Sequence, residues 1–171
     1  MKIKLRPSRL KVRRQTVKWL IVHHTAEMYK QPEARIDNSK FQMDGLVAGV
    51  HIQKQGDINY HYVIDKIKED YFPIVTRPIA YLCEWDDIDV NINNRAVHIA
   101  CLGSYDFKVP ASRLYEVLAF RLLNPMLKLF NIPPSKIKLH RDVSSNKDLS
   151  CPGDFFNEGK MITLVRKYVI K

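Results

Sequence analysis

Three side chains of types that commonly bind zinc stand where this sequence predicts the ends of strands or the loops after them. His23 or its neighbour His24 closes the apolar segment 17–25, and His140 follows a second, shorter apolar segment. Cys151 lies eleven residues beyond His140, at the far end of one loop. Two histidines and one cysteine leave a fourth position open, as in catalytic zinc sites, whereas structural zinc sites take four protein ligands. The spacing alone also fits hydrogen-bonded histidines at strand ends and a cysteine that is buried as packing.

The elements that must position these side chains alternate between strands and helices. Apolar, β-branched and aromatic runs predict strands at residues 17–25, 59–66, 71–76, 79–83, 96–102 and 137–139. Helical spacing of apolar residues predicts helices at about 38–56, 112–130 and 155–169. Pro73 indicates that its strand lies at a sheet edge, and Pro125 predicts a kink in its helix. The pattern indicates one α/β domain in which helices pack on a sheet.

Composition excludes several classes of protein. The chain has 171 residues, 46% of them hydrophobic, and can bury a full core, which excludes a disordered chain. It has no run of 18 apolar residues, so we expect no membrane-spanning helix. Its first residues lack the continuous apolar segment of an export signal, so we expect synthesis in the cytoplasm. In that reducing compartment we expect no disulfide framework among the three cysteines.

The positive charge is concentrated near the N-terminus. The net charge is +10, and residues 1–18 hold eight basic residues and no acidic one. We therefore expect residues 1–16 to form a basic arm and residues 17–171 to form a single, nearly neutral domain. The arm can steer the protein to anionic wall polymers or lipid head groups, contact nucleic acid through its phosphates, or serve as a solubilising tail.

Five segments of the chain occur in the order seen in one enzyme family. They read VKWLIVHHTA, GDINYHYVID, TRPI, NNRAVHIACLGSYD and LHRDVSSNKDLSCPGDFF. In this order they resemble the signature segments of the N-acetylmuramoyl-L-alanine amidases, the zinc amidase superfamily that includes phage lysozyme-type amidases and peptidoglycan recognition proteins. The resemblance covers about residues 17–156. It implies a central mixed β-sheet flanked by helices, of the peptidoglycan-recognition and amidase type.

The resemblance also implies a set of site residues. The zinc ligands of the family fall on His23, His140 and Cys151. His23 is preferred to His24 because neighbouring residues of a strand point to opposite faces. Tyr60 matches a tyrosine beside the metal, where its hydroxyl can bind the attacking water or the oxyanion. A zinc-bound water with a pKa near about 7 supplies a nucleophile at neutral pH.

Several residues depart from the family pattern. Lys147 lies four residues before Cys151, whereas relatives place a lysine two or three residues before the third ligand, where it stabilises the tetrahedral intermediate. A solvated surface lysine also fits that place. Ala100 stands where some relatives carry a glutamate acid/base. His98 stands where glycine is usual, which predicts a buried, hydrogen-bonded histidine.

The polar segment 84–95 predicts a long loop, and loops of that length are often functional. It retains Trp85 of a family motif, W-H-A-G, but Asp86 replaces the histidine of that motif. Because of this substitution, the family motif does not predict the shape of the substrate groove.

The resemblance implies a zinc hydrolase that cleaves the amide between N-acetylmuramic acid and L-alanine of peptidoglycan, with Tyr60 and Lys147 catalytic and Zn²⁺ as cofactor. Its partner is then peptidoglycan or a muropeptide, and we expect a monomer. The absence of an export signal fits a phage or prophage endolysin that reaches the wall by a holin-type route, and equally a cytoplasmic amidase, and the basic arm favours the endolysin. Three alternatives remain: a cytoplasmic amidase that recycles wall fragments, a non-catalytic muropeptide-binding module, and an interaction protein whose arm binds nucleic acid or an acidic partner.

Overall fold

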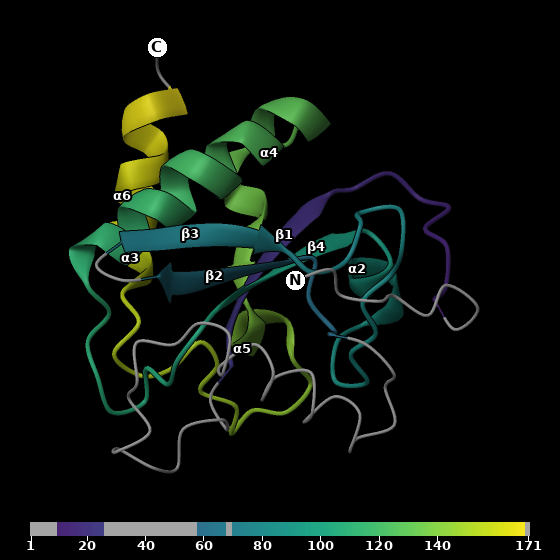
Figure 1. Cartoon of the computed structure of the whole chain (residues 1–171). Helices are drawn as coiled ribbons and strands as arrows, with labels where there is room; N and C mark the ends of the chain where they lie inside the picture. Colours follow the sequence, from purple (N-terminus) through teal and green to yellow (C-terminus); the bar gives the residue numbers. More distant parts are fainter. Residues whose placement is uncertain (1–9, 26–57, 68–69, 170–171) are drawn as a thin grey trace.

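The centre of the protein is a mixed sheet built from the most apolar segments of the chain (Figure 1). The computed structural model describes residues 10–25, 58–67 and 70–169, so the helix predicted at 38–56 lies outside the described residues. The strands are β1 (Trp19–His24), β2 (Tyr62–Ile67), β3 (Asp70–Val75), β4 (Ala96–Cys101) and β5 (Ile137–Leu139), in the order β3-β2-β4-β1-β5. Only β2 and β3 pair antiparallel, which confirms the predicted mixed sheet.

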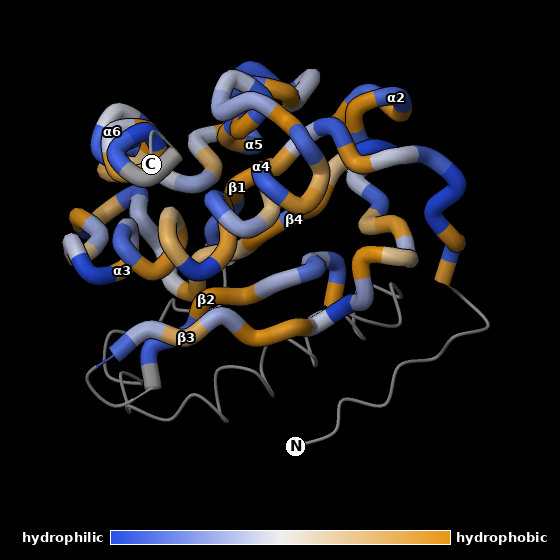
Figure 2. The backbone as a smooth tube through the Cα atoms, turned by 90° about the horizontal axis from the view of Figure 1, so that it is seen from above, coloured by the Kyte–Doolittle hydropathy of each residue, from blue (hydrophilic) through white to orange (hydrophobic). Residues whose placement is uncertain are grey.

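The positions of the strands follow from their composition. β1 and β4 lie at the interior of the sheet and are almost entirely buried, as expected for continuous apolar runs that are covered on both faces. Both are largely hydrophobic in Figure 2. β3 forms an edge, where Pro73 can be accommodated without its missing N–H, as predicted. The strand predicted at 79–83 is reduced to one isolated bridge between Tyr81 and Val12.

Helices cover one face of the sheet. They are α3 (Ser112–Val117), the π-helical segment η4 (Leu118–Leu123), α4 (Asn124–Phe130) and α6 (Glu158–Val169), gathered on the same side in Figure 1. The run 112–130 contains a π-helical turn just before Pro125, the residue at which the sequence predicts a kink. There the Asn124 N–H bonds to the Ala119 carbonyl, five residues back. This wider turn accommodates the proline, whose ring and missing N–H do not fit a regular α-helix.

Strand alternation divides the sheet into two unlike faces. Leu20 and Val22 of β1, with Val97 and Ile99 of β4, belong to the main apolar cluster beneath the helices. The intervening residues point to the opposite face. His23 is paired in register with Ala100 on that face, and this places the first predicted ligand away from the helix layer.

Short elements surround the face that carries His23. The predicted loop 84–95 contains the one-turn helix α2 (Val90–Asn93), whose first turn is capped by the Asp89 carboxylate. The 3-10 turn η5 (Pro134–Lys136) leads into β5, and α5 (His140–Val143) follows β5 directly. Within the described ranges no helix is long and apolar enough to cross a bilayer.

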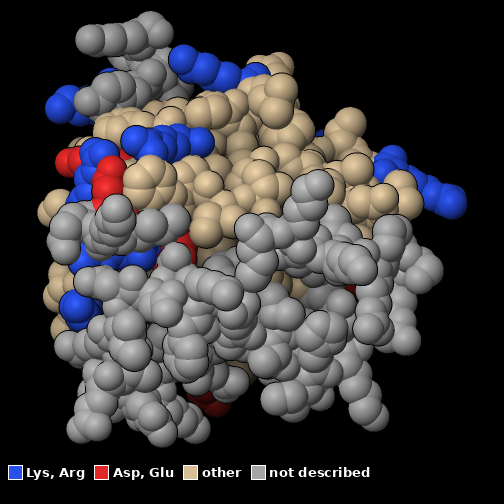
Figure 3. All heavy atoms as spheres, in the orientation of Figure 1, with Lys and Arg blue, Asp and Glu red and all other residues tan. Residues whose placement is uncertain are grey.

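The end of the predicted basic arm packs on the domain. The Arg13 guanidinium donates hydrogen bonds to the carbonyls of Asn94 and Ala96, and Lys11 contacts Glu84. Arg13 therefore belongs to the domain and is not a free cation. On the face drawn in Figure 3, the Lys and Arg side chains of the described residues lie at several separate places, some beside Asp or Glu.

Candidate metal centre

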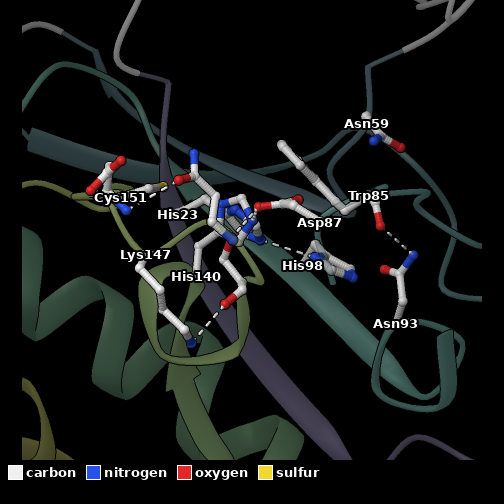
Figure 4. Close-up of polar contacts among 12 residues, drawn as sticks. His23, Asn59, Trp85, Asp87, Asn93, His98, His140, Lys147 and Cys151 are labelled. Carbon is white, nitrogen blue, oxygen red and sulfur yellow. Dashed lines mark hydrogen bonds and ion pairs between the residues drawn. The ribbon is translucent and has the colours of Figure 1, made fainter. Parts of the chain in front are cut away.

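The three predicted ligands converge on the face of the sheet opposite the helices (Figure 4). β1 carries His23 near its end, His140 is the first residue of α5, and Cys151 lies in the turn that follows. β1 and β5 are adjacent parallel strands, so their carboxyl ends lie side by side. One ligand atom from each of the three residues lies within 4.8 Å of the other two. The fold thus brings together residues that are 117 and 11 positions apart in the sequence.

The donor set fits a zinc ion. Bond lengths of about 2.1 Å to nitrogen and about 2.3 Å to sulfur place tetrahedral ligand atoms roughly 3.5 Å apart. A spacing of at most 4.8 Å reaches that value with small side-chain movements. Nδ1 of His23 is buried and has no hydrogen-bond partner, as expected of a nitrogen that is available to a metal.

Burial controls the protonation of these ligands. It lowers the pKa of His23 well below the usual histidine value, so the ring is neutral and can offer a lone pair. Burial likewise raises the pKa of the Cys151 thiol to about 12. A bound cation favours the thiolate, so metal binding releases the thiol proton. Like Cys151, Cys83 and Cys101 are buried, and none of the three forms a disulfide in the structure.

The structure separates His23 from His24. His24 lies on the other side of β1, where its Nδ1 accepts a hydrogen bond from the Tyr105 backbone N–H at 3.2 Å. Its Nε2 lies 3.8 Å from an Asp106 carboxylate oxygen. His24 therefore helps to hold the loop after β4 and does not reach the ligand cluster.

A carboxylate that the sequence analysis missed contacts the second histidine. Asp87 Oδ2 lies 2.9 Å from His140 Nε2 and accepts a hydrogen bond of 2.6 Å from the Ser144 hydroxyl. Burial lowers the pKa of His140, and the Asp87 charge acts in the opposite direction. The only sequence signal for Asp87 was its place in the long loop, two residues after Trp85.

Trp85 packs directly on the cluster. Its ring stacks on His23 with centroids 4.7 Å apart and an interplanar angle of 21°, and meets the His140 ring edge-on at 4.9 Å. The loop 84–95 thus supplies an apolar wall beside the two imidazoles.

Tyr60 also lies beside the first histidine, as predicted. Its ring centroid is 5.4 Å from that of His23, and its hydroxyl lies 3.5 Å from the His24 carbonyl. Tyr60 precedes β2, which begins at Tyr62 and not at residue 59. Tyr62 packs against the cluster under the helices, and not on the face of Tyr60, because strand alternation does not extend back to residue 60.

Lys147 is not drawn into the cluster. Its side chain is exposed, and Nζ donates a hydrogen bond to the Ser144 carbonyl at 3.4 Å. In the view of Figure 4 the ammonium points away from His23 and Cys151. His98 is fully buried and hydrogen-bonded, as predicted.

Similarity to known proteins is detectable both in sequence and in fold. Residues 13–154 match the sequence model of the N-acetylmuramoyl-L-alanine amidase family. None of the curated proteins matches the chain at a significant level.

Solved structures show the same fold at low sequence identity. N-acetylmuramoyl-L-alanine amidase LysC from Clostridium intestinale URNW is 20% identical, with a TM-score of 0.62 over 88% of this chain and 86% of that chain. Drosophila PGRP-LB is 19% identical, with a TM-score of 0.61 over 93% and 85% of the two chains. The Ph2119 endolysin from the Thermus scotoductus MAT2119 bacteriophage Ph2119 is 17% identical, with a TM-score of 0.60 over 92% and 90%.

Proposed function

Since the chain belongs to the N-acetylmuramoyl-L-alanine amidase family, we propose that it is a zinc hydrolase that cleaves the amide between N-acetylmuramic acid and L-alanine of peptidoglycan. His23, His140 and Cys151 would hold the Zn²⁺. The observation that carries the proposal is the convergence of these three buried side chains, each with a ligand atom within 4.8 Å of the others. A ligand set of this composition leaves one position for water or substrate.

A zinc ion in this position supplies a Lewis acid for the scissile carbonyl and lowers the pKa of water toward neutrality. The chain's own residues then have separate tasks. His23 and His140 bind as neutral imidazoles, because burial lowers the pKa of each. Asp87 orients the His140 ring through its contact with Nε2.

Tyr60 is the residue best placed to stabilise charge on the substrate. Its ring centroid lies 5.4 Å from that of His23, and in this proposal its hydroxyl turns from the His24 carbonyl toward the carbonyl oxygen of the bound amide. An O–H donor there stabilises the oxygen as it becomes negative. Lys147 is a second candidate for this task. Its side chain is exposed, so by rotation its ammonium can leave the Ser144 carbonyl and reach the substrate. Either Tyr60 or Lys147 can pass a proton to the leaving amine.

The substrate is proposed to be wall peptidoglycan or a muropeptide cut from it. Likeness in fold to a phage endolysin supports a phage or prophage lysin, which reaches the wall through a holin-type route. Likeness to PGRP-LB raises the alternative of a muropeptide-binding module. The complete ligand set favours hydrolysis over binding alone.

The test is product analysis by mass spectrometry after incubation of the protein with purified peptidoglycan and zinc. We expect free stem peptides that begin with alanine, glycan strands that keep their lactyl groups, and no new reducing sugar ends. Release of reducing ends, or no release of peptide by protein that has bound zinc, would contradict the proposal. Parallel reactions on soluble muropeptides separate a lysin, which prefers the polymer, from a recycling amidase, which prefers the fragment.

A further inference from the structure

His98 makes a contact with the metal centre that none of the proposed catalytic tasks uses. It lies on β4 beside Ile21 of β1, on the face that carries His23. Its side chain is fully buried, and its Nδ1 lies 2.9 Å from Nε2 of His23. We propose that His98 is a positioning residue that fixes which nitrogen of His23 faces the metal, an inference that rests on the proposed zinc site.

The hydrogen-bond donors and acceptors along this contact decide which nitrogen of each imidazole carries the proton. A neutral imidazole carries one N–H, and the other nitrogen offers a lone pair. Nδ1 of His23 has no protein partner, so it is the atom free to bind a metal. The N–H of His23 must then be at Nε2, and His98 Nδ1 accepts its hydrogen bond.

The same reasoning extends one residue further. With Nδ1 accepting, His98 carries its own proton on Nε2, and the Asn93 side-chain oxygen accepts it when the amide is turned as in Figure 4, with its nitrogen 3.5 Å from the Trp85 carbonyl. The opposite orientation of the amide satisfies more partners without a metal, because its nitrogen then donates to His98 Nε2 at 3.0 Å and to the Cys83 carbonyl at 3.1 Å, and its oxygen accepts the Trp85 backbone N–H at 3.0 Å. In that orientation the His98 proton is at Nδ1 and is donated to His23 Nε2. The arrangement proposed for the metal-bound site therefore includes a turn of the Asn93 amide.

His61 provides a comparison within the same core. Its ring stacks on that of His98 with centroids 5.9 Å apart, and its Nδ1 accepts the backbone N–H of His98 at 3.0 Å. Its Nε2 lies 2.9 Å from the Tyr81 carbonyl. His61 is thus a buried histidine of the same neighbourhood whose hydrogen bonds hold the backbone and not a ligand.

Loss of the acceptor at His98 has a defined consequence. The Nε2–H of His23 is left buried without a partner, and the ring is no longer held with Nδ1 toward the metal. Removal of such an outer hydrogen bond typically lowers metal affinity by about 10- to 100-fold. A glycine, which is usual at this place in the resembling family, would offer no such acceptor.

The experiment compares His98→Leu, His98→Asn and His61→Leu with the wild type. Leucine removes the acceptor, asparagine restores an acceptor oxygen near the position of Nδ1, and His61→Leu deletes a neighbouring buried histidine. Zinc affinity is measured by competition with a chromogenic chelator. The absorption bands of the Co²⁺-substituted proteins report the geometry at His23 and Cys151, and melting temperatures of the metal-free proteins report packing.

We expect His98→Leu to bind zinc about 10- to 100-fold more weakly and to shift the cobalt bands. His98→Asn should recover most of the affinity, and His61→Leu should lose thermal stability without losing affinity. Unchanged affinity in His98→Leu, or equal losses in all three variants, would overturn the positioning role while leaving the zinc site intact. A wild type that binds no zinc would instead refute the metal centre itself.

Discussion

On the helix-covered face of the sheet, β1 and β4 contribute Leu20, Val22 and Val97 to an apolar core. On the opposite face the same two strands carry His23 and His98. The two sets alternate along the chain and are equally buried. The apolar side chains are stabilised when neighbouring side chains of suitable shape and volume pack closely against them. The histidine set needs a hydrogen-bond partner or a metal for each buried nitrogen.

This difference explains why the two faces depend on different parts of the sequence. The helix face is completed by helices whose apolar spacing is local. The face with the histidines is completed by the loop 84–95 and the turn 144–151, which contribute individual side chains. Substitutions on the first face are therefore expected to change stability, and substitutions on the second to change metal binding and activity.

The largest expected effect is on the site face. His140→Ala removes one of the three proposed ligands, and we expect loss of the metal's contribution to cost several kcal/mol of transition-state stabilisation, or about 10³-fold or more in kcat/KM. Peptide release from peptidoglycan measures the loss. The melting temperature of the metal-free variant should stay close to that of the metal-free wild type. A variant with wild-type activity would remove His140 from the site.

The matching change on the helix face is Leu118→Ala. Leu118 is fully buried in the main apolar cluster, so truncation leaves a cavity and lowers the free energy of unfolding by about 2–5 kcal/mol. Denaturant unfolding of the metal-free protein measures this loss. Zinc affinity of the folded variant should be unchanged; a parallel loss of zinc affinity would show that the two faces are not separable.

A smaller effect is expected from Asp87→Asn. The neutral amide holds the His140 ring less firmly than the carboxylate does, and we expect zinc affinity to fall by about 10-fold. Asp86→Asn is the matched control, since Asp86 is the exposed neighbour in the same loop. Chelator competition on both variants measures the difference, and equal behaviour of the pair would exclude a role for Asp87.

The smallest effect concerns Asp65, a fully buried carboxylate of β2. Burial raises its pKa from 3.8 to about 6, so between these values the folded protein holds a proton that the unfolded chain has lost. Stability therefore falls as the pH rises through this window. Asp65→Asn should remove the decline and stabilise the protein at neutral pH by on the order of 1 kcal/mol. Parallel melting curves of variant and wild type above and below the window test this.

The sequence predicted most of the helix-covered half and the three side chains, His23, His140 and Cys151, that converge on the opposite face. Apolar runs mark β1, β4 and the helix 112–130 because their periodicity is a local property of the chain. His140 and Cys151 were accessible through the family resemblance. Asp87 was not, because a carboxylate in a polar loop gives no sign of which side chain it meets after folding.

Other differences have equally physical causes. The π-helical turn before Pro125 depends on how a long helix absorbs a proline, which either a kink or a wider turn achieves. The packing of Arg13 depends on the carbonyls of Asn94 and Ala96, which accept its hydrogen bonds and which only folding brings to it. The carbonyls that hold Arg13 lie 81 and 83 residues away in the sequence, so the local sequence does not indicate them.

The most direct test of the central claim is zinc content by elemental analysis on protein purified without chelator, for the wild type and Cys151→Ser, with peptide release from peptidoglycan assayed on the same samples. We predict about one zinc per wild-type chain, as expected for a single three-ligand site, and loss of both metal and activity in the variant. A wild type that remains metal-free and inactive after zinc is added back would contradict the claim and favour a muropeptide-binding module.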